Sequence, residues 1–264
     1  MKRLVVLSLA VALTALTASA QDWAKARLDK SPRHGEWVKV KQGSREVQSF
    51  VTYPEVKEKA TAVVVIHEIY GLTDWVRGFG DQLSESGYIA ITPDLLSGAN
   101  GGTAELQKAG SNVGQAIQAL PADQITADLN AIVEYVSKLP SCNGKVVVMG
   151  FCWGGGQTFR YATNNKDIKS ALSFYGDPPT KPEEFARIAT PVFGFYGGND
   201  NRINAKIPAA TEQMKKAGKT YEPVTYDGAG HAFMRLGEDP AGNAANKKAR
   251  DDAWVRVKEI LKKI

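Results

Sequence analysis

The sequence predicts an α/β fold, in which a mostly parallel sheet is covered by helices on both faces. Three observations lead to this prediction: short apolar runs alternate with helix-like segments, turn residues bound each run, and the runs are apolar on both faces. Such runs are typical of strands buried in a parallel sheet, and the alternation indicates βαβ units. No linker among the 264 residues is long enough to divide the chain, so we expect a single domain over residues 21–264.

An antiparallel hairpin is expected to start the sheet, because 37–40 and 50–53 flank a polar turn that contains Gln42-Gly43-Ser44. The strands expected after it are 62–66, 89–92, 146–149, 171–175, 192–196 and 223–226. Helices are expected over 75–86, 126–139, 155–161, 205–217 and 246–264, and several of them stop at Gly or Pro. The Gly-rich stretch 97–103 is expected to be a flexible insertion near a binding site.

The first twenty residues are expected to be a cleavable secretory signal peptide. Met1-Lys2-Arg3 is basic, residues 4–16 are apolar, and Ala18-Ser19-Ala20 offers small residues for cleavage before Gln21. The apolar run is too short for a permanent span of a bilayer, which makes an uncleaved membrane anchor the weaker alternative. We therefore expect an exported protein, periplasmic or secreted.

The stretch Gly150-Phe151-Cys152-Trp153-Gly154 fits the G-x-S-x-G nucleophile elbow, with Cys in place of Ser. It joins a predicted strand to a predicted helix, which is the context that the motif requires. The glycines let strand and helix approach closely while the nucleophile holds a strained backbone conformation. The first N–H groups of the helix favour a thiolate and can stabilise an oxyanion. The alternative is a Gly-rich turn that holds a small buried Cys.

Only two cysteines occur, and they flank the same predicted strand. About six extended residues span roughly 20 Å, whereas a disulfide needs Cα atoms within about 7 Å. A bridge between Cys142 and Cys152 is therefore excluded if that strand forms. Cys142 is then a loop or core thiol, and Cys152 is a free thiol.

Ligands of parallel sheets bind at the carboxyl ends of the strands. Glu68 follows one strand directly, a costly place for a carboxylate unless it forms a rim salt bridge or takes part in chemistry. Asp200 follows the strand 192–196, and His231 lies in a Gly-rich loop after the last strand. The order Cys152, Asp200, His231 is the nucleophile–acid–histidine order of α/β-hydrolases. It supplies a nucleophile, a base and a carboxylate that orients the base.

The other two histidines are expected to have different roles. His34 lies in a polar stretch and is interpreted as a surface residue. His67 stands beside Glu68 and is interpreted as structural rather than as a base. His231 is the one histidine downstream of both other candidates.

Together these residues resemble the dienelactone hydrolase (carboxymethylenebutenolidase) family of α/β-hydrolases. The resemblance extends from about Val47 to the C-terminal helix. Its most specific pieces are His67-Glu68-Ile69-Tyr70-Gly71-Leu72, Gly87-Tyr88, Pro93-Asp94-Leu95, Gly150-Phe151-Cys152-Trp153-Gly154-Gly155, Gly197-Gly198-Asn199-Asp200 and Gly230-His231-Ala232-Phe233. Cys rather than Ser at the elbow distinguishes this family from common esterases.

The resemblance implies an α/β-hydrolase fold and hydrolysis of an ester or lactone through an acyl-thioenzyme. It implies that Cys152 is the nucleophile, His231 the general base and Asp200 the acid that orients it. It also implies a role for Glu68, which contacts the resting thiol in this family and helps to deprotonate it when substrate arrives. Such a protected thiol would also resist oxidation, which suits an exported enzyme.

The resemblance implies an oxyanion hole formed by the backbone N–H groups of Ile69 and Trp153. The family holds the carboxylate of dienelactone with two arginines, one of which corresponds to Arg235. At the place of the other stands Gly98, and the loss of one guanidinium predicts weak binding of dienelactone itself. A different, extracytoplasmic ester or lactone is therefore expected.

Two candidate substrate contacts follow, Arg235 and Tyr175. Arg235 either holds an acidic group of the substrate or is a plain surface cation. The expected partner is a small molecule, and the protein is expected to be a monomer.

Charge and cysteine usage argue against several other classes of function. The formal net charge of +5 includes Lys2 and Arg3 of the signal peptide, and the lysine pairs at 247–248 and 262–263 are typical of solvated helix faces, so no nucleic-acid binding is expected. Histidines are few and no C-x-x-C or H-E-x-x-H spacing occurs, so neither a metal nor an organic cofactor is expected. The alternatives are a non-catalytic ligand-binding protein on the same fold and a thiol redox protein, although the latter lacks a nearby resolving cysteine.

Overall fold

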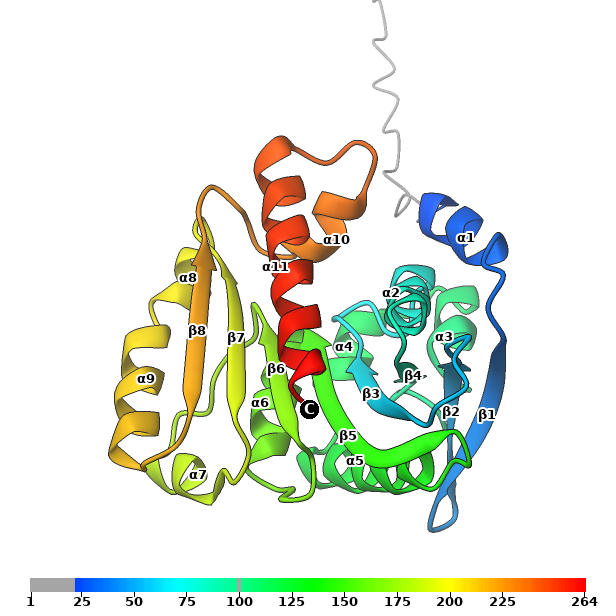
Figure 1. Ribbon diagram of the computed structural model, residues 1–264, viewed down its shortest axis with the longest axis horizontal. Helices are drawn as coiled ribbons and strands as arrows, with labels where there is room; N and C mark the ends of the chain where they lie inside the picture. The colour runs from blue at the N-terminus through cyan, green and yellow to red at the C-terminus, as the bar shows by residue number, and fades with distance from the viewer. Residues whose placement is uncertain (1–21, 99–100) are drawn as a thin grey trace, which may run out of the picture.

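A computed structural model describes residues 22–98 and 101–264 of the chain. Within them one eight-stranded sheet has the order β1-β2-β4-β3-β5-β6-β7-β8 (Figure 1). The strands are β1 Gly35–Gln42, β2 Arg45–Thr52, β3 Ala60–Ile66, β4 Ile89–Pro93, β5 Cys142–Phe151, β6 Ser170–Phe174, β7 Val192–Gly197 and β8 Tyr221–Tyr226. β2 is antiparallel to β1 and β4, and every other neighbouring pair is parallel. The mostly parallel sheet with an N-terminal hairpin is therefore confirmed.

The helices are α1 Asp22–Asp29, α2 Asp74–Glu85, α3 Thr103–Lys108, α4 Val113–Gln118, α5 Ala122–Ser137, α6 Trp153–Ala162, α7 Pro182–Arg187, α8 Asn201–Asn204, α9 Ile207–Lys216, α10 Phe233–Glu238 and α11 Ala244–Lys262. The predicted helices correspond to α2, α5, α6, α9 and α11. The helices α1, α3, α4, α7, α8 and α10 were not predicted, because four to eight residues are too few for a clear helical periodicity.

Helices cover both faces of the sheet and bury two apolar clusters (Figure 1). On one face α5, α6 and α9 pack on the sheet, and on the other face α2, α10 and α11 do so. Successive residues of a strand point to opposite faces, so Val64 of β3 joins the first cluster while Val63 and Val65 join the second. This double burial explains why the central strands are apolar throughout.

The predicted signal peptide lies outside the described residues. Among the described helices, none combines the length and the apolar character that a bilayer span would need. The lysine pair at 247–248 is exposed on α11, where it pairs with Asp251 and Asp252 one turn later, as expected of a solvated helix face.

The stretch 97–103 is anchored at its ends by Asp94. Ser97 Oγ donates to the Asp94 carbonyl oxygen (2.6 Å), and the Thr103 backbone N–H donates to Asp94 Oδ2 (2.7 Å). Residues 99–100, in the middle of this predicted insertion, lie outside the described residues. The anchored ends hold the chain where it leaves β4.

Candidate active site

Cys152 stands at a sharp turn between β5 and α6. Its φ of 55° and ψ of −116° lie in a region that side chains rarely adopt. A Cβ on Gly154 would clash with the His67 carbonyl oxygen, and one on Gly150 would clash with the Gly154 carbonyl oxygen. Glycine is therefore required on both sides of Cys152, as the elbow motif predicts.

The sulfur of Cys152 is half-buried among groups with opposing effects on its charge. Burial, followed by the negative charge of Glu68, raises the pKa of the thiol. The backbone N–H groups of Ile69 and Trp153 face the sulfur and lower the pKa by a smaller amount. The net effect holds Cys152 as a neutral thiol at neutral pH.

Asp200 and His231 meet in the loops after β7 and β8. His231 Nδ1 donates to Asp200 Oδ2 at 2.5 Å, and the Asp200 side chain is only 6% exposed. Among the described residues, no hydrogen bond joins His231 to the Cys152 sulfur. The carboxylate therefore orients an imidazole whose Nε2 is left for other partners.

Glu68 forms a buried ion pair with Arg235 rather than a hydrogen bond with the thiol. Arg235 Nε donates to Glu68 Oε2 at 2.7 Å. Burial raises the pKa of Glu68, and the attraction of Arg235 opposes this rise. Glu68 Oε1 is buried and has no hydrogen-bond partner among the described residues. The pair thus keeps one unused acceptor beside the site.

Arg235 is not a plain surface cation. Its side chain is 19% exposed, and its guanidinium lies over the ring of Tyr70, 5.4 Å from the ring centroid. Tyr70 itself is half exposed. Sequence reasoning included Tyr70 only as part of a motif, although its place next to Ile69 was a signal that it borders the site.

Tyr175 lies behind His231 and is fully buried. Its ring meets the imidazole edge-on at a centroid distance of 5.0 Å, and its φ is +39°. Burial raises the pKa of Tyr175 well above its ordinary range, and its hydroxyl has no hydrogen-bond partner among the described residues. In this structure Tyr175 is buried and packs against the imidazole of His231.

The remaining histidines and cysteine occupy the expected places. His67 is buried, donates from Nδ1 to the Glu68 carbonyl oxygen (2.9 Å) and accepts from the Leu95 backbone N–H (3.4 Å). Burial lowers the pKa of His67, so the ring is neutral and structural. His34 is exposed. Cys142 is buried and free at the start of β5, so no disulfide joins the two cysteines.

At Gly98, where the resemblance led us to expect an arginine, the guanidinium of Arg45 lies against the backbone. Arg45 Nε donates to Asp128 Oδ2 (3.0 Å) and its Nη2 donates to the Leu95 carbonyl oxygen (2.9 Å). The guanidinium of Arg45 in β2 therefore lies at this position, but it is already bound to Asp128 and to the Leu95 carbonyl oxygen. The sequence gives no signal for this contact, because Arg45 and Gly98 are far apart in the chain.

Sequence reasoning also missed the ion pair between Arg202 and Asp177. Arg202 of α8 donates to Asp177 Oδ2 at 3.1 Å, and Lys206 binds the other oxygen. The positive charge of Arg202 lowers the pKa of Cys152 slightly. Its position two residues after Asp200 was the available signal. Within residues 22–98 and 101–264, no cluster of His, Cys, Asp or Glu is arranged to hold a metal ion.

A sheet of this topology, with a strained residue in an elbow after a central strand and an Asp–His contact after later strands, defines an α/β-hydrolase. The family model described as the dienelactone hydrolase family matches residues 47–264, and the chain belongs to this family. Membership indicates a hydrolase that acts on ester or lactone bonds.

Individual relatives agree with this assignment. A protein of Saccharolobus solfataricus that carries the name carboxymethylenebutenolidase is 30% identical over 252 residues, covering 83% of this chain and 95% of the relative. One of the same name from Escherichia coli K12 is 29% identical over 76% of both chains. The crystal structure of a Klebsiella pneumoniae protein named as a dienelactone hydrolase has a TM-score of 0.77 at 22% identity, covering 88% of this chain and 99% of that one. At this identity the last likeness supports the fold alone.

Proposed function

We propose that the protein hydrolyses a small ester or lactone with Cys152 as its nucleophile. The observation that carries the proposal is the environment of Cys152, a strained elbow residue whose sulfur faces the backbone N–H groups of Ile69 and Trp153. The Asp200–His231 contact of 2.5 Å stands at the same edge of the sheet. A nucleophile, two preorganised donors and an oriented base are the parts that acyl transfer needs.

In the first half-reaction the Cys152 thiolate adds to the substrate carbonyl carbon. The carbonyl electron pair moves to oxygen, and the N–H groups of Ile69 and Trp153 stabilise that oxyanion. Collapse of the intermediate breaks the carbon–oxygen bond and forms a thioester, and the proton that the thiol gave up passes by way of Glu68 and His231 to the leaving oxygen. In the second half-reaction His231 takes a proton from water and hydroxide adds to the thioester. The acid and the Cys152 thiolate then separate, and His231 returns its proton to the thiolate.

Glu68 is proposed to activate the thiol. The neutral thiol is a poor nucleophile, and a base must remove its proton before attack. Glu68 has a buried, unused oxygen and a raised pKa, so a proton placed there is held well. An acidic group on the substrate would compete with Glu68 for Arg235 and would free the carboxylate for this task.

The proposal includes export, which the basic and apolar start of the chain suggests. Fractionation of cells that produce the full chain tests it. A shortened protein beginning at Gln21 in the periplasm or medium supports export, and a full-length protein retained in the cytoplasm contradicts it.

The function is tested with purified protein on a small activated aryl ester and on dienelactone. Cys152→Ala is expected to lower turnover by at least about a thousandfold while the circular dichroism spectrum stays unchanged. Cys142→Ala is the matched control and is expected to keep full activity. Turnover that survives in Cys152→Ala would contradict the proposed nucleophile, and absence of turnover in the unaltered protein would favour a ligand-binding role on the same fold.

A further inference from the structure

The N-terminal segment, residues 22–34, precedes the family region and packs against α2. Ala24 is buried there, and Trp23 packs on the apolar cluster of that face. Arg33 binds the buried Asp81 of α2 through two hydrogen bonds of 2.8 and 2.5 Å. The segment is therefore fastened to the domain at its far end, independently of the contact described next.

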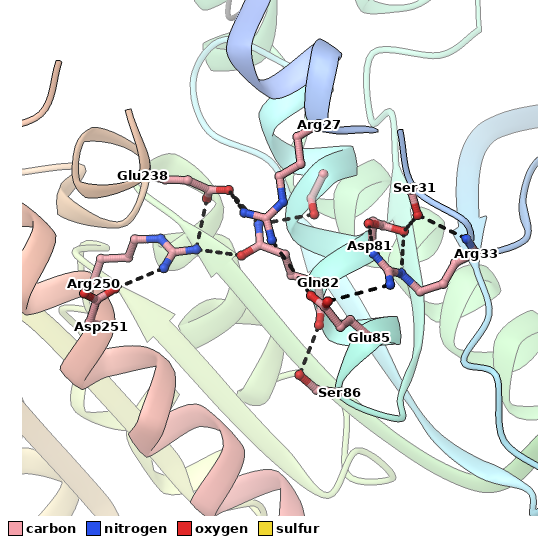
Figure 2. A network of polar contacts seen from close by, with 11 residues as sticks. Arg27, Ser31, Arg33, Asp81, Gln82, Glu85, Ser86, Glu238, Arg250 and Asp251 are labelled. Atoms are coloured by element: carbon pink, nitrogen blue, oxygen red, sulfur yellow. Dashed lines mark hydrogen bonds and ion pairs between the residues drawn. The ribbon is translucent and has the colours of Figure 1, made fainter. Parts of the chain in front are cut away.

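A second contact of this segment reaches the last residue of α10. Arg27 Nη1 donates to Glu238 Oε1 at 2.8 Å (Figure 2). The Glu238 side chain is only 7% exposed and also accepts from Gln82 Nε2 (2.8 Å) and Trp75 Nε1 (3.0 Å). Arg250 of α11 lies 3.5 Å from Glu238 Oε2. One carboxylate thus connects α1, α2, α10 and α11.

The helix that ends at Glu238 begins two residues after the candidate base, His231. Ala232 separates His231 from α10 and adopts a left-handed backbone with a φ of 61°. Arg235, one turn before Glu238, makes the ion pair with Glu68. Any movement of this short helix therefore moves Arg235, which is the only hydrogen-bond partner of the Glu68 carboxylate among the described residues.

The two ends of α10 are held by different contacts. At the near end Gly230 N–H donates to Asn246 Oδ1 (2.9 Å), which fixes the loop before His231. At Gly237, the residue before Glu238, a Cβ would clash with the Asn246 carbonyl oxygen, so this part of the helix lies directly on α11. At the far end the described contacts of Glu238 are the polar ones given above. A six-residue helix has little stability of its own, so these contacts, together with the burial of Phe233 and Met234, determine its position.

We propose that Glu238 is a positioning residue, and that Arg27 from outside the family region completes the anchor that holds α10 and keeps Arg235 against Glu68. Arg27 supplies a positive charge to a carboxylate that α2 and α11 have largely removed from water. Loss of that charge leaves Glu238 less firmly bound, and the end of α10 that carries it can then shift slightly and displace Arg235. For its turnover readout this inference rests on the proposed function.

The test compares Arg27→Gln with Arg33→Gln, since both arginines belong to the same segment and both bind buried carboxylates. Arg27→Gln and Glu238→Gln are each expected to lower kcat/KM for an aryl ester by about fivefold, because small displacements near a site are costly. Arg33→Gln is expected to lower the melting temperature but to change kcat/KM less than about twofold. Arg27→Lys is expected to recover most of the activity.

A double-mutant cycle separates positioning from general stability. In an Arg235→Gln background, Arg27→Gln is expected to cost less than about twofold, because its effect passes through Arg235, while the effect of Arg33→Gln stays additive. The same cycle is run on the rate at which iodoacetamide alkylates Cys152, which needs no turnover and so distinguishes this inference from the proposed function. Additive effects of Arg27→Gln in both assays, or unchanged kcat/KM in Arg27→Gln and Glu238→Gln, would overturn the proposal.

Discussion

Two arginine–carboxylate pairs, one buried and one exposed, each contain one charge that shifts the pKa of the Cys152 thiol. Glu68 and Arg235 are 3% and 19% exposed, whereas Arg202 and Asp177 are 60% and 47% exposed. The N–O distances of 2.7 and 3.1 Å are similar. These two charges act in opposite directions, because Glu68 raises the pKa of the thiol and Arg202 lowers it.

The comparison shows that burial decides how strongly an ion pair influences the site. Water and salt screen the exposed pair, and such pairs contribute about 0–1 kcal/mol. The buried pair is screened little, and removal of one partner leaves a charge without water or counter-ion. Although both pairs join an arginine to a carboxylate, substitutions are therefore expected to have large effects at Glu68–Arg235 and small effects at Asp177–Arg202.

The largest expected effect is that of Arg235→Gln on stability. The variant leaves Glu68 buried without its cation, which should cost about 3 kcal/mol at pH 8. The pKa of Glu68 is raised in the folded protein, so its contribution to stability is greatest below its ordinary value of about 4.3 and falls as the pH rises from there through the raised pKa. The cost should therefore shrink at pH 5, as measured by urea unfolding at both pH values. An equal loss of stability in Arg202→Gln would contradict the comparison.

Glu68→Gln comes next and is expected to separate thiol acidity from turnover. The variant removes a negative charge that raises the pKa of Cys152, so alkylation by iodoacetamide should begin at a lower pH. Turnover should nevertheless fall by about a hundredfold in kcat with little change in KM, because the proposed base is lost. A matching loss in kcat and in substrate binding would argue against the activating role of Glu68.

Arg202→Gln should have a smaller effect of the opposite sign. Its loss should raise the pKa of the thiol slightly and change the free energy of unfolding by less than about 1 kcal/mol. The shift should disappear near 1 M salt, where the Debye length is about 3 Å. Lys206→Gln is the control, since Lys206 binds the same Asp177. A salt-independent shift in Arg202→Gln would mean that this pair also acts in an environment that salt does not reach.

The smallest effect is expected for Cys142→Ala, which provides the reference for every alkylation assay above. Cys142 is 4% exposed and lies at the far end of β5 from the elbow. Alkylation of the native protein should modify one thiol, and Cys142→Ala should leave its rate and pH profile unchanged. If mass spectrometry counts two rapidly modified thiols, the difference in exposure between Cys142 and Cys152 does not control their rates of alkylation.

Much of the fold and of the candidate site could be predicted because the signals are local. Each central strand is a short apolar run, and the elbow needs glycines at positions 150 and 154, so both appear in the linear pattern. The order of Cys152, Asp200 and His231 then brings them to one edge, since parallel strands end on the same side. Asp200 and His231 follow the neighbouring strands β7 and β8, so this rule brings the two residues close to each other.

The contacts that sequence reasoning missed connect residues that are far apart in the chain. Nothing near Glu68 indicates that Arg235 is its partner, and nothing near Arg27 indicates Glu238. The short helix α10 was not predicted, because six residues carry no clear period and their position depends on α2 and α11. The burial of Tyr175 behind His231 also depends on packing and not on local pattern.

By itself the sequence determined the α/β class, the strand order along the chain, the elbow at Cys152 and the candidate acid and base. These features depend on periodicity, on glycine at sterically required positions, and on the rule that parallel strands share a carboxyl edge. The tertiary structure alone decided that Glu68 pairs with Arg235 and not with the thiol, that Arg45 lies against Gly98, and that the N-terminal segment reaches α10. Those outcomes depend on which charged groups packing brings together and removes from water, and no local pattern encodes that choice.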